Sequence, residues 1–157
     1  MNSCQPSEDS MGSPRSIAVD PPAKRVLIVE NQEMIRLVLC RMLKSWGLDC
    51  HPAPDLLSAF RVVSSEGPFD AVICDYALPD GDICTMVALM REHEVMAPIV
   101  APAGLAGVTT NPEAGVELLT KPFDPIELKR ALERLLGICL RKEADSTQGR
   151  ERAAARA

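Results

Sequence analysis

The chain has 157 residues, of which 46% are hydrophobic and 25% are charged, and its formal net charge is −5. This composition is typical of one globular domain with flexible ends, and two full domains are not expected. Acidic residues outnumber basic ones by 22 to 17. The excess argues against nucleic-acid binding, which needs a basic face to meet the phosphates.

Membrane insertion and secretion are not expected either. No apolar run approaches the roughly 18 residues that cross a bilayer, and the N-terminal segment lacks the basic and apolar regions of a signal peptide. We therefore expect a cytoplasmic protein. Its six cysteines are scattered without a CxxC pair, which predicts reduced thiols, with neither a zinc site nor a disulfide framework.

The two ends of the chain differ from its centre. Residues 1–24 contain four prolines among Ser, Asp and Gly, which predicts a disordered leader. Residues 141–157 are rich in Ala and Arg and have no bulky apolar face, so they are interpreted as a disordered basic tail. Residues 25–140 remain as the folded domain.

In the first half of this domain, short apolar runs alternate with helical patterns. Residues 26–29 are continuously apolar, as in a strand that is buried on both faces of a parallel sheet. Apolar residues with a period near 3.6 predict a helix over residues 35–46, stopped by Gly47. A weak strand at residues 49–53 precedes a helix that Asp55 can cap.

The middle of the domain repeats the pattern. Residues 71–74 form another fully apolar strand, and the turn at residues 78–81 opens a helix with an inward apolar face. A strand follows at residues 99–101. The next stretch, residues 101–115, is rich in Gly, Pro and Thr, so the expected fourth helix should be short or absent.

The final strand and helix have clear boundaries. Residues 116–120 form the last strand. The last helix begins with Asp124 as an acidic cap, Pro125 at the first helical position and Glu127 at N3.

Five strands that alternate with helices predict a doubly wound α/β domain with a five-stranded parallel sheet, because parallel neighbours need crossover connections. Ligands of such sheets bind beyond the carboxyl ends of the strands. Three of these ends carry reactive residues, namely Glu30 and Asn31, Asp75, and Lys121. Two carboxylates and one ammonium group are thus expected on one rim.

Four stretches resemble a response-regulator receiver domain, the phosphoacceptor module of two-component signalling. They are RVLIVENQEMIR, FDAVICDYALPDG, APIVAPAG and LLTKPFDPIEL, in the right order across nearly all of residues 25–140. The resemblance implies a flavodoxin-like receiver fold with strand order 2-1-3-4-5. PIVAPAGL and the short 18-residue spacing from Ala103 to Lys121 resemble a subfamily with a PFxFATGY motif and a degenerate fourth helix.

The resemblance also implies a phosphoryl-transfer site. Asp75 would be the nucleophile that attacks phosphohistidine, and Lys121 would contact the phosphoryl group. Glu30 and Asn31 occupy the paired metal positions, and Asp75 with the backbone carbonyl of Ala77 would complete a Mg²⁺ site.

Three positions depart from the family pattern. Asn31 replaces an acidic residue, which should weaken Mg²⁺ binding because affinity follows ligand charge; an ordinary role as a helix cap is equally open for it. Ala103 replaces the threonine or serine whose hydroxyl follows the phosphoryl group, and Leu118 replaces the aromatic residue that moves with it. The usual switch is therefore doubtful.

Several residues have ordinary structural interpretations. An aspartate such as Asp75 is often only a turn former at a strand end, although the following LPDG turn disfavours this. His51 and His93 are expected to be solvated, and the methionines at helical spacing, including Met34, are expected to pack in the core.

The main functional hypothesis is a single-domain response regulator that receives a phosphoryl group on Asp75 from a histidine kinase or phosphotransfer protein. It would act through an unknown protein partner, with no nucleic acid or membrane involved. The alternative is a pseudo-receiver that works as an interaction module without phosphorylation. An enzyme is not expected: a haloacid-dehalogenase phosphatase needs a second aspartate where Ala77 stands. A flavodoxin-like carrier needs a phosphate loop where acidic residues follow the first strand.

Overall fold

The computed structural model describes residues 22–104 and 115–141. Most of the predicted leader and tail lie outside these residues. The same holds for residues 105–114, where the short or absent fourth helix was expected.

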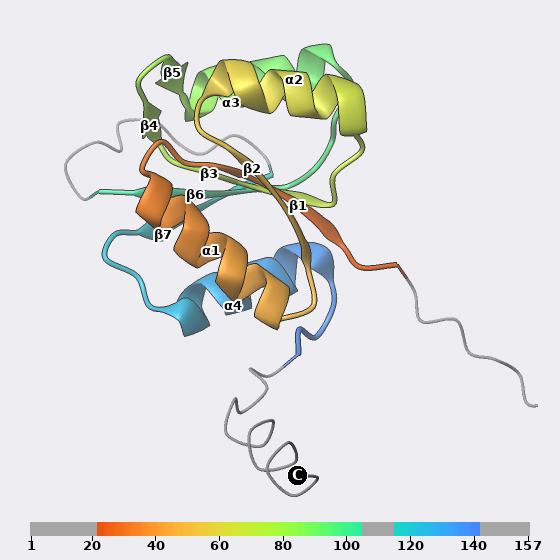
Figure 1. The fold of residues 1–157 in the computed structure, drawn as a ribbon, viewed down its shortest axis with the longest axis vertical. Coiled ribbons are helices and arrows are strands. Elements are labelled where there is room, and N and C mark those ends of the chain that lie inside the picture. The colour runs from red at the N-terminus through yellow and green to blue at the C-terminus, as the bar shows by residue number, and fades with distance from the viewer. Residues whose placement is uncertain (1–21, 105–114, 142–157) are drawn as a thin grey trace, which may run out of the picture.

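The described residues contain one five-stranded parallel sheet with the order β2-β1-β3-β6-β7 (Figure 1). Its strands are β1 (Arg25–Val29), β2 (Asp49–Ala53), β3 (Ala71–Cys74), β6 (Ile99–Ala103) and β7 (Val116–Thr120). If the five strands of this sheet are numbered 1 to 5 along the chain, their order in the sheet is 2-1-3-4-5. The predicted doubly wound, flavodoxin-like fold with strand order 2-1-3-4-5 is therefore confirmed.

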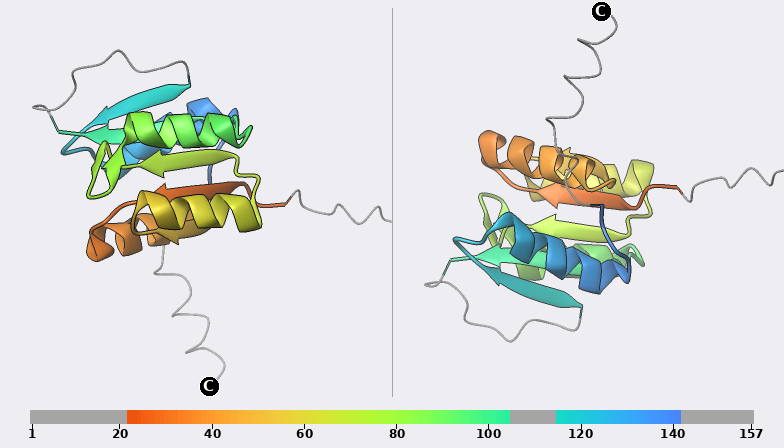
Figure 2. Two further views of the ribbon diagram at one scale, coloured as in Figure 1. Left: turned by 90° about the horizontal axis from the view of Figure 1, so that it is seen from above. Right: turned by 90° about the horizontal axis from the view of Figure 1, so that it is seen from below.

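Four described helices lie in two layers, one on each face of the sheet (Figure 2). Helices α1 (Glu33–Ser45) and α4 (Pro125–Leu136) share one hydrophobic cluster with the sheet, and α2 (Leu56–Glu66) and α3 (Ile83–Glu92) share the other. No helix in the described ranges has the length and apolar character needed to cross a membrane.

The central strands are apolar throughout because both of their faces are covered. Val26 and Ile28 of β1 point into the α1/α4 cluster, whereas Leu27 and Val29 point into the α2/α3 cluster. All four side chains are fully buried. This burial explains why a continuous run, rather than an alternating one, predicted the strand.

Three helices begin at an aspartate whose carboxylate accepts backbone N–H groups, at Asp55, Asp82 and Asp124. The predicted box at α4 is complete: Asp124 accepts from the N–H of Glu127 at 2.9 Å, and Glu127 accepts from the N–H of Asp124 at 2.9 Å. Helix α1 differs, because it begins after Gln32 without any side-chain cap. The cap interpretation of Asn31 was therefore wrong.

A short antiparallel hairpin that the sequence did not predict follows β3. It pairs β4 (Ala77–Leu78) with β5 (Gly81–Asp82) around the expected turn. Gly81 has φ of +158°, and a Cβ atom there would meet the side chain of Leu56 at 2.5 Å. The Leu56 side chain could move aside, so it is the backbone conformation that favours glycine at this point of the hairpin.

Two other expectations, for His51 and for Met34, were wrong. The ring of His51 is only partly exposed: its Nε2 lies 3.0 Å from Asp49, and its Nδ1 lies 2.7 Å from Glu66. It is thus held between two carboxylates rather than solvated. Met34 is 71% exposed, because it lies beside a surface groove and not in the core.

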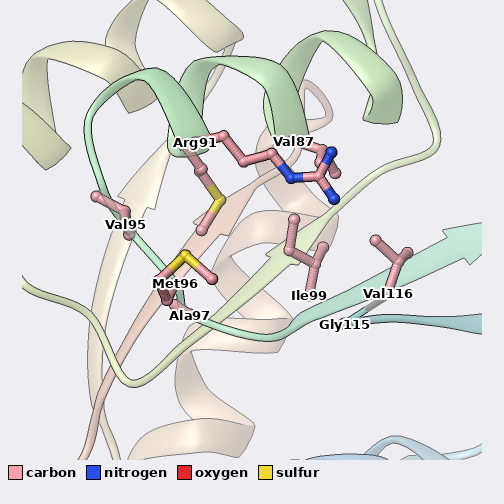
Figure 3. Close-up of a pocket in the computed structure, with 9 residues that line it drawn as sticks. Val87, Arg91, Val95, Met96, Ala97, Ile99, Gly115 and Val116 are labelled. Carbon is pink, nitrogen blue, oxygen red and sulfur yellow. The ribbon is translucent and has the colours of Figure 1, made fainter. Parts of the chain in front are cut away.

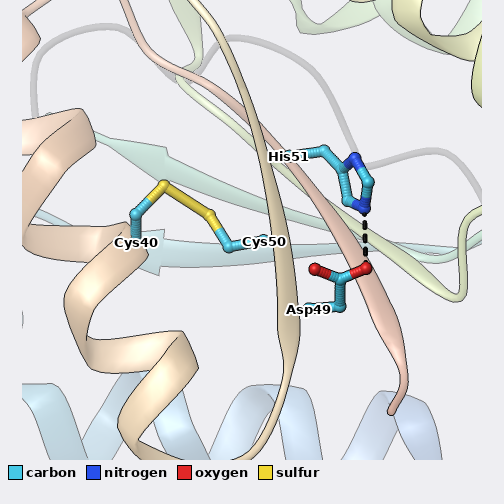
Figure 4. Close-up of a disulfide and its surroundings, with 4 residues drawn as sticks. All are labelled: Cys40, Asp49, Cys50 and His51. Atoms are coloured by element: carbon cyan, nitrogen blue, oxygen red, sulfur yellow. Dashed lines mark hydrogen bonds and ion pairs between the residues drawn. A yellow bond between two sulfur atoms is a disulfide. The ribbon is translucent and has the colours of Figure 1, made fainter. Parts of the chain in front are cut away.

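The structure also closes a disulfide between Cys40 and Cys50, which corrects the prediction of reduced thiols without a disulfide (Figure 4). Cys40 faces the sheet from α1, and the turn at Trp46 and Gly47 brings β2 back beside that helix. The two Cα atoms are 5.7 Å apart, within the usual range for a disulfide. Scattered spacing alone gave no sign of this proximity.

Reduction of the Cys40–Cys50 bond should lower the free energy of unfolding by about 2 to 3 kcal/mol, since the bond closes a short loop in the unfolded chain. Urea unfolding with and without a reductant measures the change. The Cys40→Ala/Cys50→Ala double variant should lose this dependence, and Cys139→Ser, at an exposed free cysteine, should keep it. Equal stability of the wild type in both buffers would contradict the bond.

Candidate functional site

Three of the predicted reactive residues meet at the carboxyl ends of the parallel strands. Glu30 follows β1, Asp75 follows β3 and Lys121 follows β7. Backbone hydrogen bonds fix each position: the N–H of Asp75 donates to the carbonyl of Val29 at 2.9 Å, and that of Lys121 donates to Ala103 at 2.8 Å. The sheet therefore sets the distances between these side chains.

A lysine and two carboxylates form the centre of this rim. The Nζ atom of Lys121 donates to Oδ2 of Asp75 at 3.0 Å and lies 3.9 Å from Oε2 of Glu30. The side chain of Glu30 is 4% exposed, that of Asp75 is 13% exposed and that of Lys121 is 32% exposed. Two acids and one base thus share a site that is partly withdrawn from solvent.

Of the three charged side chains at the rim, that of Glu30 is the most withdrawn from solvent. Among the described residues it is the sole buried charged side chain. Burial, together with the neighbouring Asp75 carboxylate, raises the pKa of Glu30 above its usual 4.5. The N–H of Gln32, which donates to Oε1 at 2.9 Å, and the Lys121 ammonium oppose this rise. A further cation beside Glu30 would favour its ionised form.

The oxygen atoms at the rim suit a hard divalent cation. The carboxylates of Glu30 and Asp75 both lie beside Lys121. Asn31 follows Glu30 and is exposed, and Ala77 lies in the hairpin after β3, so its carbonyl and the Asn31 amide would have to supply the further oxygens. No group of three or more His, Cys, Asp or Glu side chains within the described ranges is placed to hold a metal ion. Magnesium also accepts carbonyl and water oxygens, so the set fits Mg²⁺ with one fewer charge than two paired acids would give.

Two further residues, which sequence reasoning did not single out, hold the loops of the rim. The Nη1 atom of Arg36 donates to the carbonyls of Glu30 at 2.6 Å and Asn31 at 3.3 Å. Asp80 accepts from the first backbone N–H groups of α2, at 3.1 Å from each of two residues. The one feature of the sequence that could have pointed to Arg36 is its position in the first helical turn after the acidic loop.

Of the two positions expected to carry the switch, Ala103 lies at the end of its strand and Leu118 lies in the middle of its strand. Ala103 ends β6 and is 3% exposed, so its methyl group is enclosed and no hydroxyl is present there. Leu118 lies in β7 and packs, partly buried, against the α2/α3 cluster. Neither side chain can provide a hydroxyl or aromatic readout.

Two other features of the described residues, a buried cysteine and an apolar pocket, do not form a second reactive site. Cys74 precedes Asp75, but burial raises the pKa of its thiol to about 12, so it is not a nucleophile at neutral pH. An apolar pocket of about 190 Å³ lies between α3 and the amino ends of β6 and β7 (Figure 3). Those strand ends are opposite the rim, and its described lining contains no carboxylate.

The raised pKa of Glu30 predicts a pH-dependent stability. The folded protein holds the Glu30 proton more tightly than the unfolded chain, so stability falls as pH rises from 4.5 through the raised pKa. The neutral variant Glu30→Gln should therefore gain stability relative to the wild type at about pH 7.5 compared with about pH 4.5.

Urea unfolding in metal-free buffer at both pH values gives this comparison. The control is Glu92→Gln, at an exposed carboxylate on α3, which should show no such gain. A stability difference between Glu30→Gln and the wild type that is the same at both pH values would refute the prediction.

The family model of the response regulator receiver domain matches residues 26–133. The transcriptional regulatory protein TcrA of Mycobacterium tuberculosis H37Rv is 31% identical over 116 residues, which cover 71% of this chain and 45% of TcrA. The phosphate regulon transcriptional regulatory protein PhoB of Klebsiella pneumoniae is 28% identical over 120 residues, covering 73% of this chain and 52% of PhoB. This chain therefore spans about half or less of these curated relatives.

Solved structures agree on the fold. The receiver domain of the sensor histidine kinase PA1611 from Pseudomonas aeruginosa PAO1 superposes with a TM-score of 0.66 at 28% identity, covering 74% of this chain and 99% of that one. That structure has a magnesium ion coordinated in its active site cleft. A response regulator receiver protein from Sinorhizobium medicae WSM419 has the same TM-score at 23% identity, with 73% and 95% covered. The chain thus belongs to the response-regulator receiver domain family of two-component signalling.

Proposed function

We propose that Asp75 accepts a phosphoryl group from the phosphohistidine of a histidine kinase or phosphotransfer protein, and that the domain then acts through contacts with other proteins. The observation that carries this proposal is the 3.0 Å contact between the Lys121 ammonium and the Asp75 carboxylate, beside the buried Glu30. A fixed cation is already in place where negative charge accumulates during transfer.

In the proposed reaction, a carboxylate oxygen of Asp75 attacks phosphorus, a new P–O bond forms and the P–N bond to histidine breaks. The leaving imidazole nitrogen keeps the electron pair and takes up a proton. Lys121 orients Asp75 before the attack and balances charge on the phosphoryl oxygens afterwards. Glu30, Asn31, Asp75 and the carbonyl of Ala77 would hold Mg²⁺, which would neutralise further phosphoryl charge from a site weakened by Asn31.

A groove beside the site supports a protein donor. A cavity of about 340 Å³ lies between α1 and the start of α4, lined by Met34, Ile35, Val38, Leu39, Met42, Phe123 and Pro125. Met34 is 71% and Val38 is 50% exposed. Apolar side chains that remain exposed on two neighbouring helices suit an amphipathic helix of a partner. The loops that lead into these helices carry Glu30 and Lys121, so a partner docked here would reach Asp75.

One observation favours a second function. The enclosed methyl group of Ala103 and the aliphatic Leu118 remove the hydroxyl and the aromatic ring that report phosphorylation in relatives of the usual pattern. A ligand that contacts two conformations equally cannot shift their populations. A pseudo-receiver that binds its partner without phosphorylation is therefore the alternative.

Phosphotransfer distinguishes these functions. Incubation with a promiscuous, radiolabelled histidine kinase should label the wild type, and Asp75→Asn should lose nearly all of the label, because Asp75 is the carboxylate that Lys121 contacts at 3.0 Å. Glu92→Gln, at an exposed carboxylate on α3 away from the rim, is the matched control and should still be labelled. Equal labelling of Asp75→Asn and the wild type would refute the assignment. No labelling of any form, with a donor that labels another receiver, would favour the pseudo-receiver.

A further inference from the structure

We propose that Arg36 is a positioning residue for the cation-binding half of the site. Its guanidinium group would hold the loop that aims Glu30 and Asn31, and it would do so without touching the cation. The inference rests on the proposed function, because it concerns the Mg²⁺ site that phosphoryl transfer would use.

The contacts of Arg36 are unusual for a helical surface residue. A single nitrogen, Nη1, donates to two consecutive carbonyls, those of Glu30 at 2.6 Å and Asn31 at 3.3 Å. The following residue is fixed as well, because the N–H of Gln32 donates to the Glu30 carboxylate at 2.9 Å. The loop from β1 to α1 is thus held from both sides, by the guanidinium group and by the Glu30 side chain.

The loop needs this support because α1 lacks an N-terminal cap. The other three described helices begin at aspartates that bind their first N–H groups, whereas Gln32 makes no such bond. A side-chain cap normally fixes the angle at which the chain enters a helix. Arg36 restores this restraint from within the first turn by holding the carbonyls of the entering residues.

The charge of Arg36 and its positioning role predict opposite changes in Mg²⁺ affinity when Arg36 is removed. A guanidinium cation close to a divalent-cation site repels the metal, so its removal should tighten Mg²⁺ binding if electrostatics dominate. If Arg36 positions the loop, its removal frees Glu30 and Asn31 and should weaken Mg²⁺ binding. The sign of the change in affinity therefore separates the two roles. A merely structural role would alter stability and leave the affinity of the folded protein unchanged.

Isothermal calorimetry with Mg²⁺ on the full chain tests the proposal. Arg36→Met, which keeps the aliphatic stem, should raise the Kd by about tenfold or more, as loss of an outer-shell partner commonly does. Arg36→Lys, which keeps the charge without the planar fork, should fall between Arg36→Met and the wild type. Arg41→Met, at an exposed arginine further along α1, is the matched control and should leave the Kd unchanged.

Circular dichroism and the thermal midpoint of each variant establish that the protein measured is folded. Should Arg36→Met fail to fold, Arg36→Lys carries the test, with a Kd several-fold above that of the wild type. An unchanged or lower Kd for Arg36→Met overturns the positioning role of Arg36 and leaves the proposed metal site standing. If Arg36→Met does not fold, the same result for Arg36→Lys has the same meaning. Absence of Mg²⁺ binding by the wild type, and by Asn31→Asp with its second acid restored, overturns the proposed metal site as well.

Discussion

The sharing of one ammonium group by two carboxylates is the constraint on which the rest of the site depends. A carboxylate that is withdrawn from water is costly unless a cation or hydrogen bonds compensate it. Glu30 has both, through the Gln32 N–H and the Lys121 ammonium, yet its pKa remains raised. The domain therefore keeps an unfavourable charge arrangement at its rim, which a further cation would relieve.

The charged side chains of the rim are placed by the sheet register and by hydrogen bonds that hold the backbone of the loops carrying them. Lys121 comes from an edge strand that is separated from β3 by β6, so the parallel register must be correct before it reaches Asp75. Arg36 holds the loop after β1, and Asp80 joins the hairpin after β3 to the start of α2. The loops after β1 and β3 thus each have a side-chain anchor. Ala103 and Leu118 take no part in these anchors, so under the proposed function the site that would accept a phosphoryl group is separate from the two positions that would report it.

The sequence predicted the five strands of the sheet, the four described helices and the rim, because these follow local patterns and the general geometry of parallel sheets. Continuous apolar runs marked the buried strands, Asp124 and Glu127 marked the start of α4, and parallel topology placed Glu30, Asp75 and Lys121 at one edge. The features that escaped prediction depend on contacts between segments that only the fold brings together. Cys40 meets Cys50 across a helix-to-strand turn, and His51 meets Glu66 from a different element. Asp80 and Arg36 likewise act on backbone groups, which leave no residue-type pattern in the sequence.

The most direct test of the account is the response of the folded protein to beryllofluoride, a phosphoryl mimic, in the presence of Mg²⁺. Two-dimensional NMR of the ¹⁵N-labelled chain should show saturable shifts centred on the amides of Asp75, Glu30 and Lys121, and these shifts should vanish in Asp75→Asn. Such a result would establish a competent phosphoacceptor site whatever the natural donor. Spectra that do not change at saturating mimic, or that change equally in Asp75→Asn, would contradict the central claim that this charge cluster receives a phosphoryl group.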